Sequence, residues 1–239
     1  MKIDEEKCIV CGLCVPYCPM GAISMDDVAV IDQDECVDCG ACLRSGVCSP
    51  DCIIFEPAPW PRSIRVVFSD PTREHTELRI PGSGIETVCN NEVTGMFKRG
   101  WVGITLTCGR PAVGTRFRDV EKVAQAMAKL GAKFEPRCPV TFLMEDINTG
   151  KIKKEVLNEK VLSAEVHCIF PIEEIKDVLM ALKEVSKEVD TVFGVSCITR
   201  VAPDDSLPVA TILSDLGIPY SIWGKNNVGL GRPLAEGGN

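Results

Sequence analysis

The chain has 239 residues, of which 45% are hydrophobic and 25% are charged, so its composition is that of an ordinary soluble globular protein. Its net charge of −8 and its pI near 5.0 argue against nucleic acid or an anionic membrane as a partner. No run approaches the roughly 20 apolar residues of a membrane span, and the N-terminus lacks the apolar stretch of a signal peptide. We therefore expect a cytoplasmic protein with one large domain or two smaller ones.

Two cysteine motifs near the N-terminus carry most of the information in this chain. Fourteen cysteines without a secretion signal indicate metal ligands kept reduced in an oxygen-poor cytosol rather than disulfides. Residues 8–19 have the pattern C-x2-C-x2-C-x3-C-P, in which three thiolates bind one iron–sulfur cube and the fourth is turned toward a second cube. A similar motif follows, so the sequence predicts two [4Fe–4S] clusters. The two motifs contain Cys8, Cys11, Cys14 and Cys18, and then Cys36, Cys39, Cys42 and Cys48.

Residues 1–56 form an internal repeat that resembles the bacterial-type ferredoxins with two [4Fe–4S] clusters. The resemblance implies electron transfer in an anaerobic setting, with short strands separated by cluster-binding loops. In that family the fourth cysteine of each motif serves the other cluster. Structural zinc sites also use C-x2-C pairs, but zinc does not require this double series of three cysteines followed by Cys-Pro. The implied ligand sets are Cys8, Cys11, Cys14 and Cys48 for the first cluster, and Cys36, Cys39, Cys42 and Cys18 for the second.

The second motif departs from the ferredoxin pattern. Five residues separate Cys42 from Cys48, proline does not follow Cys48, and Cys52 is an additional thiol. When the two copies of the repeat are aligned, Cys48 lies over Cys18 and Cys52 lies over Ala22. This alignment favours Cys48 as the ligand and leaves Cys52 as the alternative.

The acidic excess of the chain lies entirely in this first segment. Residues 1–56 contain three basic and eleven acidic side chains, whereas the rest of the chain is electrically balanced. A surface of one sign steers association with a patch of the opposite sign, so we expect a redox partner protein with a basic docking face. The alternative interpretation is that the charge only keeps a small domain soluble.

Residues 57–62 form a proline-rich linker, and residues 63–239 are expected to form an α+β domain for docking or ligand binding. Between residues 101 and 198 the expected order is β-α-β-β-α-β, which is typical of a split βαβ sandwich, the ferredoxin-like or ACT-like antiparallel fold with two helices on one face. The hydrophobic spacing predicts strands at 64–68, 101–107, 140–144, 161–170, 191–198 and 218–222, and helices at 119–130, 171–185 and 208–216.

Three arginines are candidates for binding a small anionic ligand. Arg110 and Arg232 each lie in a Gly-Arg-Pro triplet, and Arg116 lies near an expected helix start, where exposed N–H groups suit a carboxylate or phosphate. The alternative is that these triplets are turns with surface arginines. No catalytic residue can be assigned from the sequence.

Five further cysteines fall outside any C-x2-C pair and are expected to be mostly small buried side chains. Cys89 and Cys108 lie beside glycine-rich segments and are the better candidates for a reactive thiol. The five are Cys89, Cys108, Cys138, Cys168 and Cys197.

The segment from about residue 80 to 118 resembles iron–sulfur proteins of the 6-hydroxynicotinate reductase-like group. The resemblance rests on Gly84-Ile-Glu86, on Asn91-Glu-Val-Thr-Gly95 and on Gly109-Arg-Pro. It implies reduction of a nitrogen heteroaromatic acid with electrons from ferredoxin. Three functions therefore remain open: an electron-transfer subunit of an oxidoreductase that relays low-potential electrons to a reductase active site, a ferredoxin-dependent reductase of a small anionic substrate, and a redox-linked regulator with an ACT-like ligand-binding domain.

Overall fold

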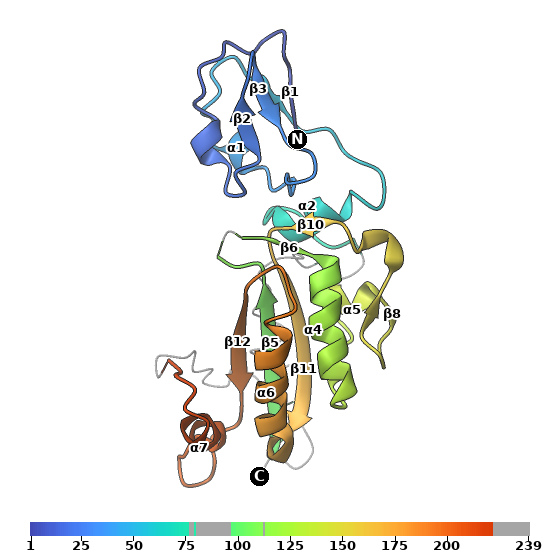
Figure 1. The fold of residues 1–239 in the computed structure, drawn as a ribbon, viewed down its shortest axis with the longest axis vertical. Coiled ribbons are helices and arrows are strands. Elements are labelled where there is room, and N and C mark those ends of the chain that lie inside the picture. The colour runs from blue at the N-terminus through green and yellow to red at the C-terminus, as the bar shows by residue number, and fades with distance from the viewer. Residues whose placement is uncertain (77–78, 80–96, 112, 222–239) are drawn as a thin grey trace.

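The computed structural model describes residues 1–76, 79, 97–111 and 113–221 and places the protein in the α+β class. Two separate apolar cores are present in this part of the chain, one within residues 1–55 and one within residues 64–218. We call residues 1–56 the N-terminal segment and residues 63–221 the C-terminal segment. They lie at opposite ends of the molecule in Figure 1, with the N-terminal segment in blue at the top. None of the helices in the described residues is long and apolar enough to cross a membrane.

The N-terminal segment consists of two small antiparallel strand pairs joined by cysteine-bearing loops. The repeat is visible in its backbone, because the Asp4 N–H donates to the Cys52 carbonyl and the Asp32 N–H donates to the Ala22 carbonyl, both at 2.8 Å. The pairs are β1 (Lys2–Ile3) with β4 (Ile53–Ile54) and β2 (Ile23–Met25) with β3 (Ala29–Ile31), and the helical turns are η1 (Val15–Tyr17) and α1 (Ala41–Arg44).

A four-stranded antiparallel sheet organises the C-terminal segment, with the strand order β12-β5-β11-β7. Helices α4 (Phe117–Lys129) and α6 (Ile175–Val185) pack together on one face of this sheet, in front of β5 and β11 in Figure 1. The strands are β5 (Trp101–Cys108), β7 (Lys133–Phe134), β11 (Ala164–Pro171) and β12 (Phe193–Ile198).

The sheet and helices fit together because apolar residues recur with the period of each element. Alternate residues of β5 (Val102, Ile104 and Leu106) are fully buried beneath the helices, as strand geometry requires. The buried residues of α4 lie three or four positions apart, which places them on one helical face. The helix ends before Gly131, whose φ of 80° continues the chain in the left-handed region. The buried α4 face comprises Phe117, Asp119, Val120, Val123, Ala124 and Met127.

Shorter elements surround this sandwich. The helix α2 and the strand pair β6–β10 form the end of the C-terminal segment that faces the N-terminal segment in Figure 1. Helix α7 (Pro208–Asp215) ends before Gly217, as the hydrophobic pattern predicts. The remaining elements are α2 (Ile64–Ser69), β6 (Thr115–Arg116), α5 (Pro139–Phe142), β8 (Met144–Asp146), β9 (Lys151–Ile152), η3 (Lys154–Val156), β10 (Lys160–Val161) and η4 (Ile172–Glu174).

Three of the expected strands are wrong. Residues 64–68 form helix α2, in which Ile64, Arg65, Phe68 and Ser69 are buried at helical spacing. Residues 140–144 lie mostly in helix α5, which begins with Pro139 at a position that favours proline, and the second strand of the sheet in chain order is β7 instead. In the described part of the third range, residues 218–221, there is no strand.

Candidate iron–sulfur sites

The cysteines of the two motifs gather in two groups. We call the first group the outer site; it surrounds Cys14, which is buried at the start of η1. Burial raises the pKa of the Cys14 thiol, and the charges of three neighbouring thiolates raise it further. The Cys8 pKa is lowered, chiefly by a hydrogen bond from the Ala29 backbone. The neighbours of Cys14 in this group are Cys11, Cys48 and Cys8.

The second group, which we call the inner site, surrounds a small cavity. Its thiols come from both motifs, because one cysteine of the first motif joins three of the second. A set of four thiols around a hollow is the donor set that a [4Fe–4S] cluster requires, so the residues present fit such a group. The cavity is lined by Cys18, Cys36, Cys39 and Cys42, together with Met1, Pro19, Met20, Ile23, Ile31, Val37 and Gly40.

A single metal ion makes a different demand on geometry from a cluster. Within the described residues, no three His, Cys, Asp or Glu side chains are arranged to hold one ion. Ligands of one zinc ion all lie about 2.3 Å from the same centre, whereas the thiolates of a [4Fe–4S] cluster each bind a different iron atom. The ligand spacing that would hold one zinc ion therefore differs from the spacing that a [4Fe–4S] cluster requires.

Equivalent positions of the two loops share the same backbone conformation. Gly12 and Gly40 both have a φ of 69°, and the residues two positions earlier, Val10 and Asp38, have φ values of 57° and 54°. At Gly40 a side chain would also collide with a neighbour, because a Cβ there would lie 2.6 Å from Nη1 of Arg44. The glycine of each C-x-x-C-G is therefore favoured by its left-handed backbone conformation.

The structure distinguishes the surroundings of Cys48 and Cys52. The Cys52 N–H donates to Sγ of Cys48 at 3.3 Å, just as the Ala22 N–H donates to Sγ of Cys18 at 3.2 Å. Asp51 has a φ of 51° where the first copy has a glycine with a φ of 64°. Cys48 thus has the backbone environment of Cys18, and Cys52 has that of Ala22. The Cys52 thiol is buried 3.1 Å from Sγ of Cys48, and burial raises its pKa to about 12.

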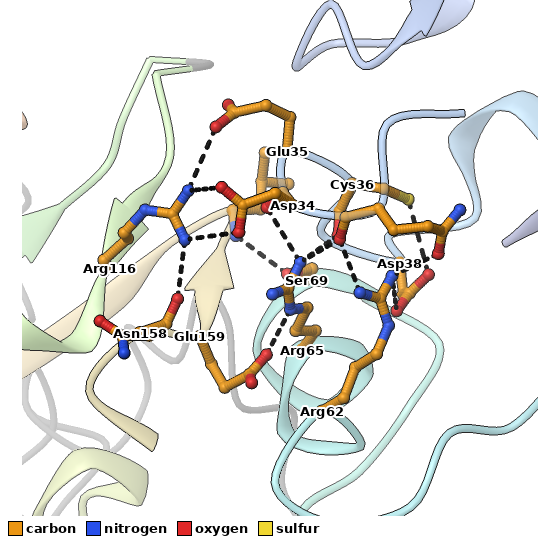
Figure 2. A network of polar contacts seen from close by, with 12 residues as sticks. Asp34, Glu35, Cys36, Asp38, Arg62, Arg65, Ser69, Arg116, Asn158 and Glu159 are labelled. Carbon is orange, nitrogen blue, oxygen red and sulfur yellow. Dashed lines mark hydrogen bonds and ion pairs between the residues drawn. The ribbon is translucent and has the colours of Figure 1, made fainter. Parts of the chain in front are cut away.

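A buried arginine connects the inner site to the C-terminal segment (Figure 2). Arg65, on α2, is only 4% exposed. Its Nη1 donates to the carbonyl oxygens of Gln33, Asp34 and Cys36, at 3.0, 3.1 and 2.8 Å, and its Nε donates to the Glu159 carboxylate. One guanidinium group therefore holds the chain leading into an inner-site cysteine and bonds the carbonyl of that cysteine.

A second arginine, which belongs to the N-terminal segment, also bonds the carbonyl of an inner-site cysteine and pairs with a carboxylate of the C-terminal segment. Arg44, at the end of α1, donates through Nη2 to the Cys39 carbonyl at 2.7 Å, and its Nη1 lies 2.9 Å from the Asp70 carboxylate. Burial raises the Asp70 pKa, but hydrogen bonds from Thr72 and the charge of Arg44 outweigh it, so the net shift is downward. Asp70 is therefore a carboxylate held against this arginine.

Further ion pairs hold the two segments together around the inner site (Figure 2). Arg116 binds Asp34 at 2.7 Å and Glu35 at 3.2 Å, and its hydrogen bond lowers the Asp34 pKa. Lys160 also pairs with Glu35. Arg62 lies 3.2 Å from the Asp38 carboxylate, which also receives the N-terminal ammonium group. Part of the acidic excess is therefore matched by cations of the same chain.

The two segments also make a close apolar contact. Gly114 lies just before β6, and a Cβ at this position would lie 2.6 Å from Cε of Met20. Met20 itself lines the inner-site cavity. A glycine in the C-terminal segment thus allows a side chain of the inner site to approach its backbone.

Of the three arginines predicted to bind an anion, the structure describes two, and their surroundings differ. Arg116 is engaged by two carboxylates, as described above, and it precedes α4 as the N-cap residue. Arg110 is exposed on the loop after β5. Its charge contributes to the lowered pKa of Glu165, although burial acts in the opposite direction and the hydrogen bond with His167 contributes more. Arg232 lies outside the described residues.

The structure also describes four of the five cysteines that lie outside the two motifs. Cys108 is completely buried, and burial raises its pKa to about 12, so the expectation that it is reactive is wrong. Burial also raises the pKa of Cys138 to about 12, and that of Cys197 to about 11, and it raises the pKa of Cys168 strongly. These thiols are poor nucleophiles at neutral pH. Cys89 lies outside the described residues.

Several buried polar side chains of the structure have only a weak signal in the sequence. Arg65 lies in the apolar run Ile-Arg-Val-Val-Phe, where its only signal was a charge within a hydrophobic stretch. A buried polar pair also lies on the sheet face opposite α4 and α6: Nε2 of His167 is 3.3 Å from the Glu165 carboxylate, and Nδ1 of His167 is 3.0 Å from the Thr105 hydroxyl. Alternation along β11 places both residues on this face, but no motif distinguishes them from residues of an ordinary strand.

Comparison with known families agrees with the chemistry of the N-terminal segment. A family model described as "4Fe-4S binding domain" matches residues 1–24. No curated protein and no solved structure matches the chain. The chain thus carries a ferredoxin-like iron–sulfur segment that binds a [4Fe–4S] cluster and has the general role of such segments, electron transfer.

Proposed function

We propose that this protein carries two [4Fe–4S] clusters and relays low-potential electrons, one at a time, to the active site of a reductase. The observation that carries this proposal is the interlocking of the two motifs: Cys18 lines the inner-site cavity together with Cys36, Cys39 and Cys42. Such an exchange of the fourth cysteine is what two adjacent clusters require. When bound, the clusters supply one-electron transfer, and the chain supplies thiolates, shields the inner site from water and sets the electrostatic field.

The C-terminal segment is proposed to be a docking platform with the split βαβ arrangement. Its sheet order, β12-β5-β11-β7, and its two helices on one face support this assignment. Direct binding of a small anionic substrate or regulator is the less favoured alternative, because Arg116 is already paired with Asp34 and Glu35.

Metal analysis is the first test. Protein purified without oxygen should contain about eight iron and eight sulfide per chain, with the broad visible absorption of iron–sulfur clusters. Stoichiometric zinc without this absorption would overturn the proposal. About four iron per chain would mean that only one of the two sites is a cluster site.

The choice between Cys48 and Cys52 can be tested with a matched pair of variants. We expect Cys48→Ser to lose one cluster or to convert it to a three-iron form, because Cys48 has the same backbone environment as Cys18. Cys52→Ser is the control, since it removes a thiol of the same size from the same loop and should retain both clusters. Iron content and electron paramagnetic resonance spectra distinguish the outcomes, and the reverse pattern would make Cys52 the ligand.

The redox partner is proposed to dock at the outer site. Here Ile9 is 62% exposed and Leu13 is 55% exposed, on either side of the exposed Cys11, and Glu5 and Glu6 are exposed nearby in the sequence. Exposed apolar side chains close in the sequence to exposed carboxylates suit a partner whose docking face combines apolar and basic residues.

Rates of electron exchange test this docking surface. Leu13→Glu should slow reduction by the partner without loss of iron, because it places a charge in the centre of the contact. The rate for the unmodified protein should fall as salt rises, since exposed charges are screened over roughly 8 Å at physiological ionic strength. A rate that is the same at low and high salt would mean that the acidic surface serves solubility only.

A further inference from the structure

The two proposed cluster sites have very different electrostatic surroundings. In the outer site, Cys11 is exposed and the nearest basic side chain in the sequence, Lys7, is paired with Asp4 at 3.1 Å. In the inner site, two guanidinium groups bond the carbonyl oxygens of ligand cysteines, Arg44 at Cys39 and Arg65 at Cys36. The repeat is thus nearly symmetric in backbone but not in charge.

The orientation of these ion pairs decides their effect. Arg44 and Arg65 lie against the cysteine carbonyls, and their partner carboxylates, Asp70 and Glu159, belong to the C-terminal segment. The positive end of each pair therefore faces the inner site. Because Arg65 is 4% exposed, solvent screens its charge much less than it screens a surface charge.

One carboxylate does lie close to an inner-site thiol. Oδ1 of Asp38 is 3.5 Å from Sγ of Cys36 and would disfavour added negative charge there. However, this carboxylate is held by two cations, the N-terminal ammonium of Met1 and the guanidinium of Arg62. The Arg62 guanidinium alone balances the charge of this carboxylate, so Asp38 does not cancel the field of the other two arginines.

Reduction of an iron–sulfur cluster adds one negative charge, and nearby cations favour the reduced form. We propose that Arg44 and Arg65 make the inner site the more easily reduced of the two, so that the protein is a directed relay. An electron given up by a reduced one-electron carrier protein enters at the exposed outer site and comes to rest at the inner site, beside α2, β6 and β10. The carrier is oxidised by one electron and the inner site is reduced by one. This inference rests on the proposed two-cluster function and adds its direction.

Matched variants of one ion pair test the direction. Arg44→Gln removes the positive end of the pair next to Cys39, and Asp70→Asn removes its negative end. We expect Arg44→Gln to lower the higher of the two midpoint potentials by about 59 mV or more, which is a tenfold change in a one-electron equilibrium. Asp70→Asn should raise the same potential. A merely structural role would move it in the same direction in both variants, because both break the same contact.

Arg65→Gln and Glu159→Gln repeat the test at the second pair, with the same opposite signs expected. The potentials are measured by redox titration followed by electron paramagnetic resonance, and iron analysis of each variant shows whether both clusters remain. Eight iron with an unmoved higher midpoint in Arg44→Gln and Arg65→Gln would overturn the directed relay and leave the proposed function standing. A change of only the lower midpoint potential in these two variants would also overturn the directed relay and leave the proposed function standing. Four iron and a single midpoint in the unmodified protein would overturn the two-cluster function itself.

Discussion

The two segments of this protein are stabilised by different means. The apolar core of the N-terminal segment is small, and three of its nine buried members are the cysteines Cys14, Cys36 and Cys42. The C-terminal segment has a continuous core of aliphatic and aromatic side chains between its sheet and the helices α4 and α6. A segment of fewer than 60 residues with so little apolar surface depends on its metal for stability, whereas a sandwich with a full core does not. Bound metal therefore stabilises the N-terminal segment, whereas apolar packing stabilises the C-terminal segment.

Removal of iron should give the largest effect. The loss of structure should be confined to the N-terminal segment. We expect a chelator under oxidising conditions to expose the amides of β2 and β3 to rapid hydrogen exchange, because their core then surrounds an empty site. The amides of β5 and β11 should stay protected. Hydrogen exchange followed by mass spectrometry measures both regions at once, and equal loss of protection in both would mean that the C-terminal segment depends on bound iron too.

A core substitution should give the reverse pattern. Phe170 on β11 is completely buried, so Phe170→Ala should destabilise the C-terminal segment by about 3–5 kcal/mol through lost contacts and the cavity left behind. Chemical denaturation monitored by circular dichroism measures the change. The visible iron–sulfur absorption in native conditions serves as the control, and it should be unchanged because Phe170 belongs to the other core.

The contact between the segments can be weakened without touching either core. A side chain at Gly114 would collide with Met20 and would also hold a φ of 71°, which is unfavourable for a β-branched residue. We expect Gly114→Val to loosen the contact and to speed cleavage by proteases within residues 57–62. Gly131→Val is the matched control, because Gly131 has a similar φ of 80° but no atom within 4 Å of its Cβ position. Equal cleavage in both variants would mean that backbone strain alone is responsible.

The smallest effect is expected at the buried thiols of the C-terminal segment. Burial raises the pKa of both Cys108 and Cys138 to about 12, so little thiolate exists at pH 7 or 8 and reagent has no access. Alkylation of the chelated protein should therefore label Cys8 and Cys11 and leave Cys108 and Cys138 unlabelled until denaturant is added. Peptide mass spectrometry identifies the sites, and early labelling of Cys108 would show that the sheet opens when iron is lost.

The failed prediction at residues 64–68 has a physical cause in the tertiary structure. Residues 64–68 have the composition of a strand. In the structure, however, Arg65 and Ser69 are buried as well as Ile64 and Phe68, and only helical spacing allows all four side chains to be buried together. Tertiary contacts overrode local propensity there. Part of the acidic excess is used within the molecule, since Asp34, Glu35 and Asp38 bind Arg116, Lys160 and Arg62, and the basic docking face of a partner stays a prediction. A charge count carries no information about which cations lie opposite.

The sequence by itself determined the iron–sulfur chemistry of the first segment, because ligand spacing is local and the C-x2-C-x2-C pattern is confined to a single loop. It also determined the main helices and long strands of the C-terminal segment, whose periodicity runs over many residues. Only the tertiary structure decided the surroundings of the inner site. Arg65 meets the Cys36 carbonyl, and Arg116 meets Asp34, across separations along the chain that no local pattern records. Electrostatic fields depend on distances in space, so the asymmetry between the two sites appears only after the chain has folded.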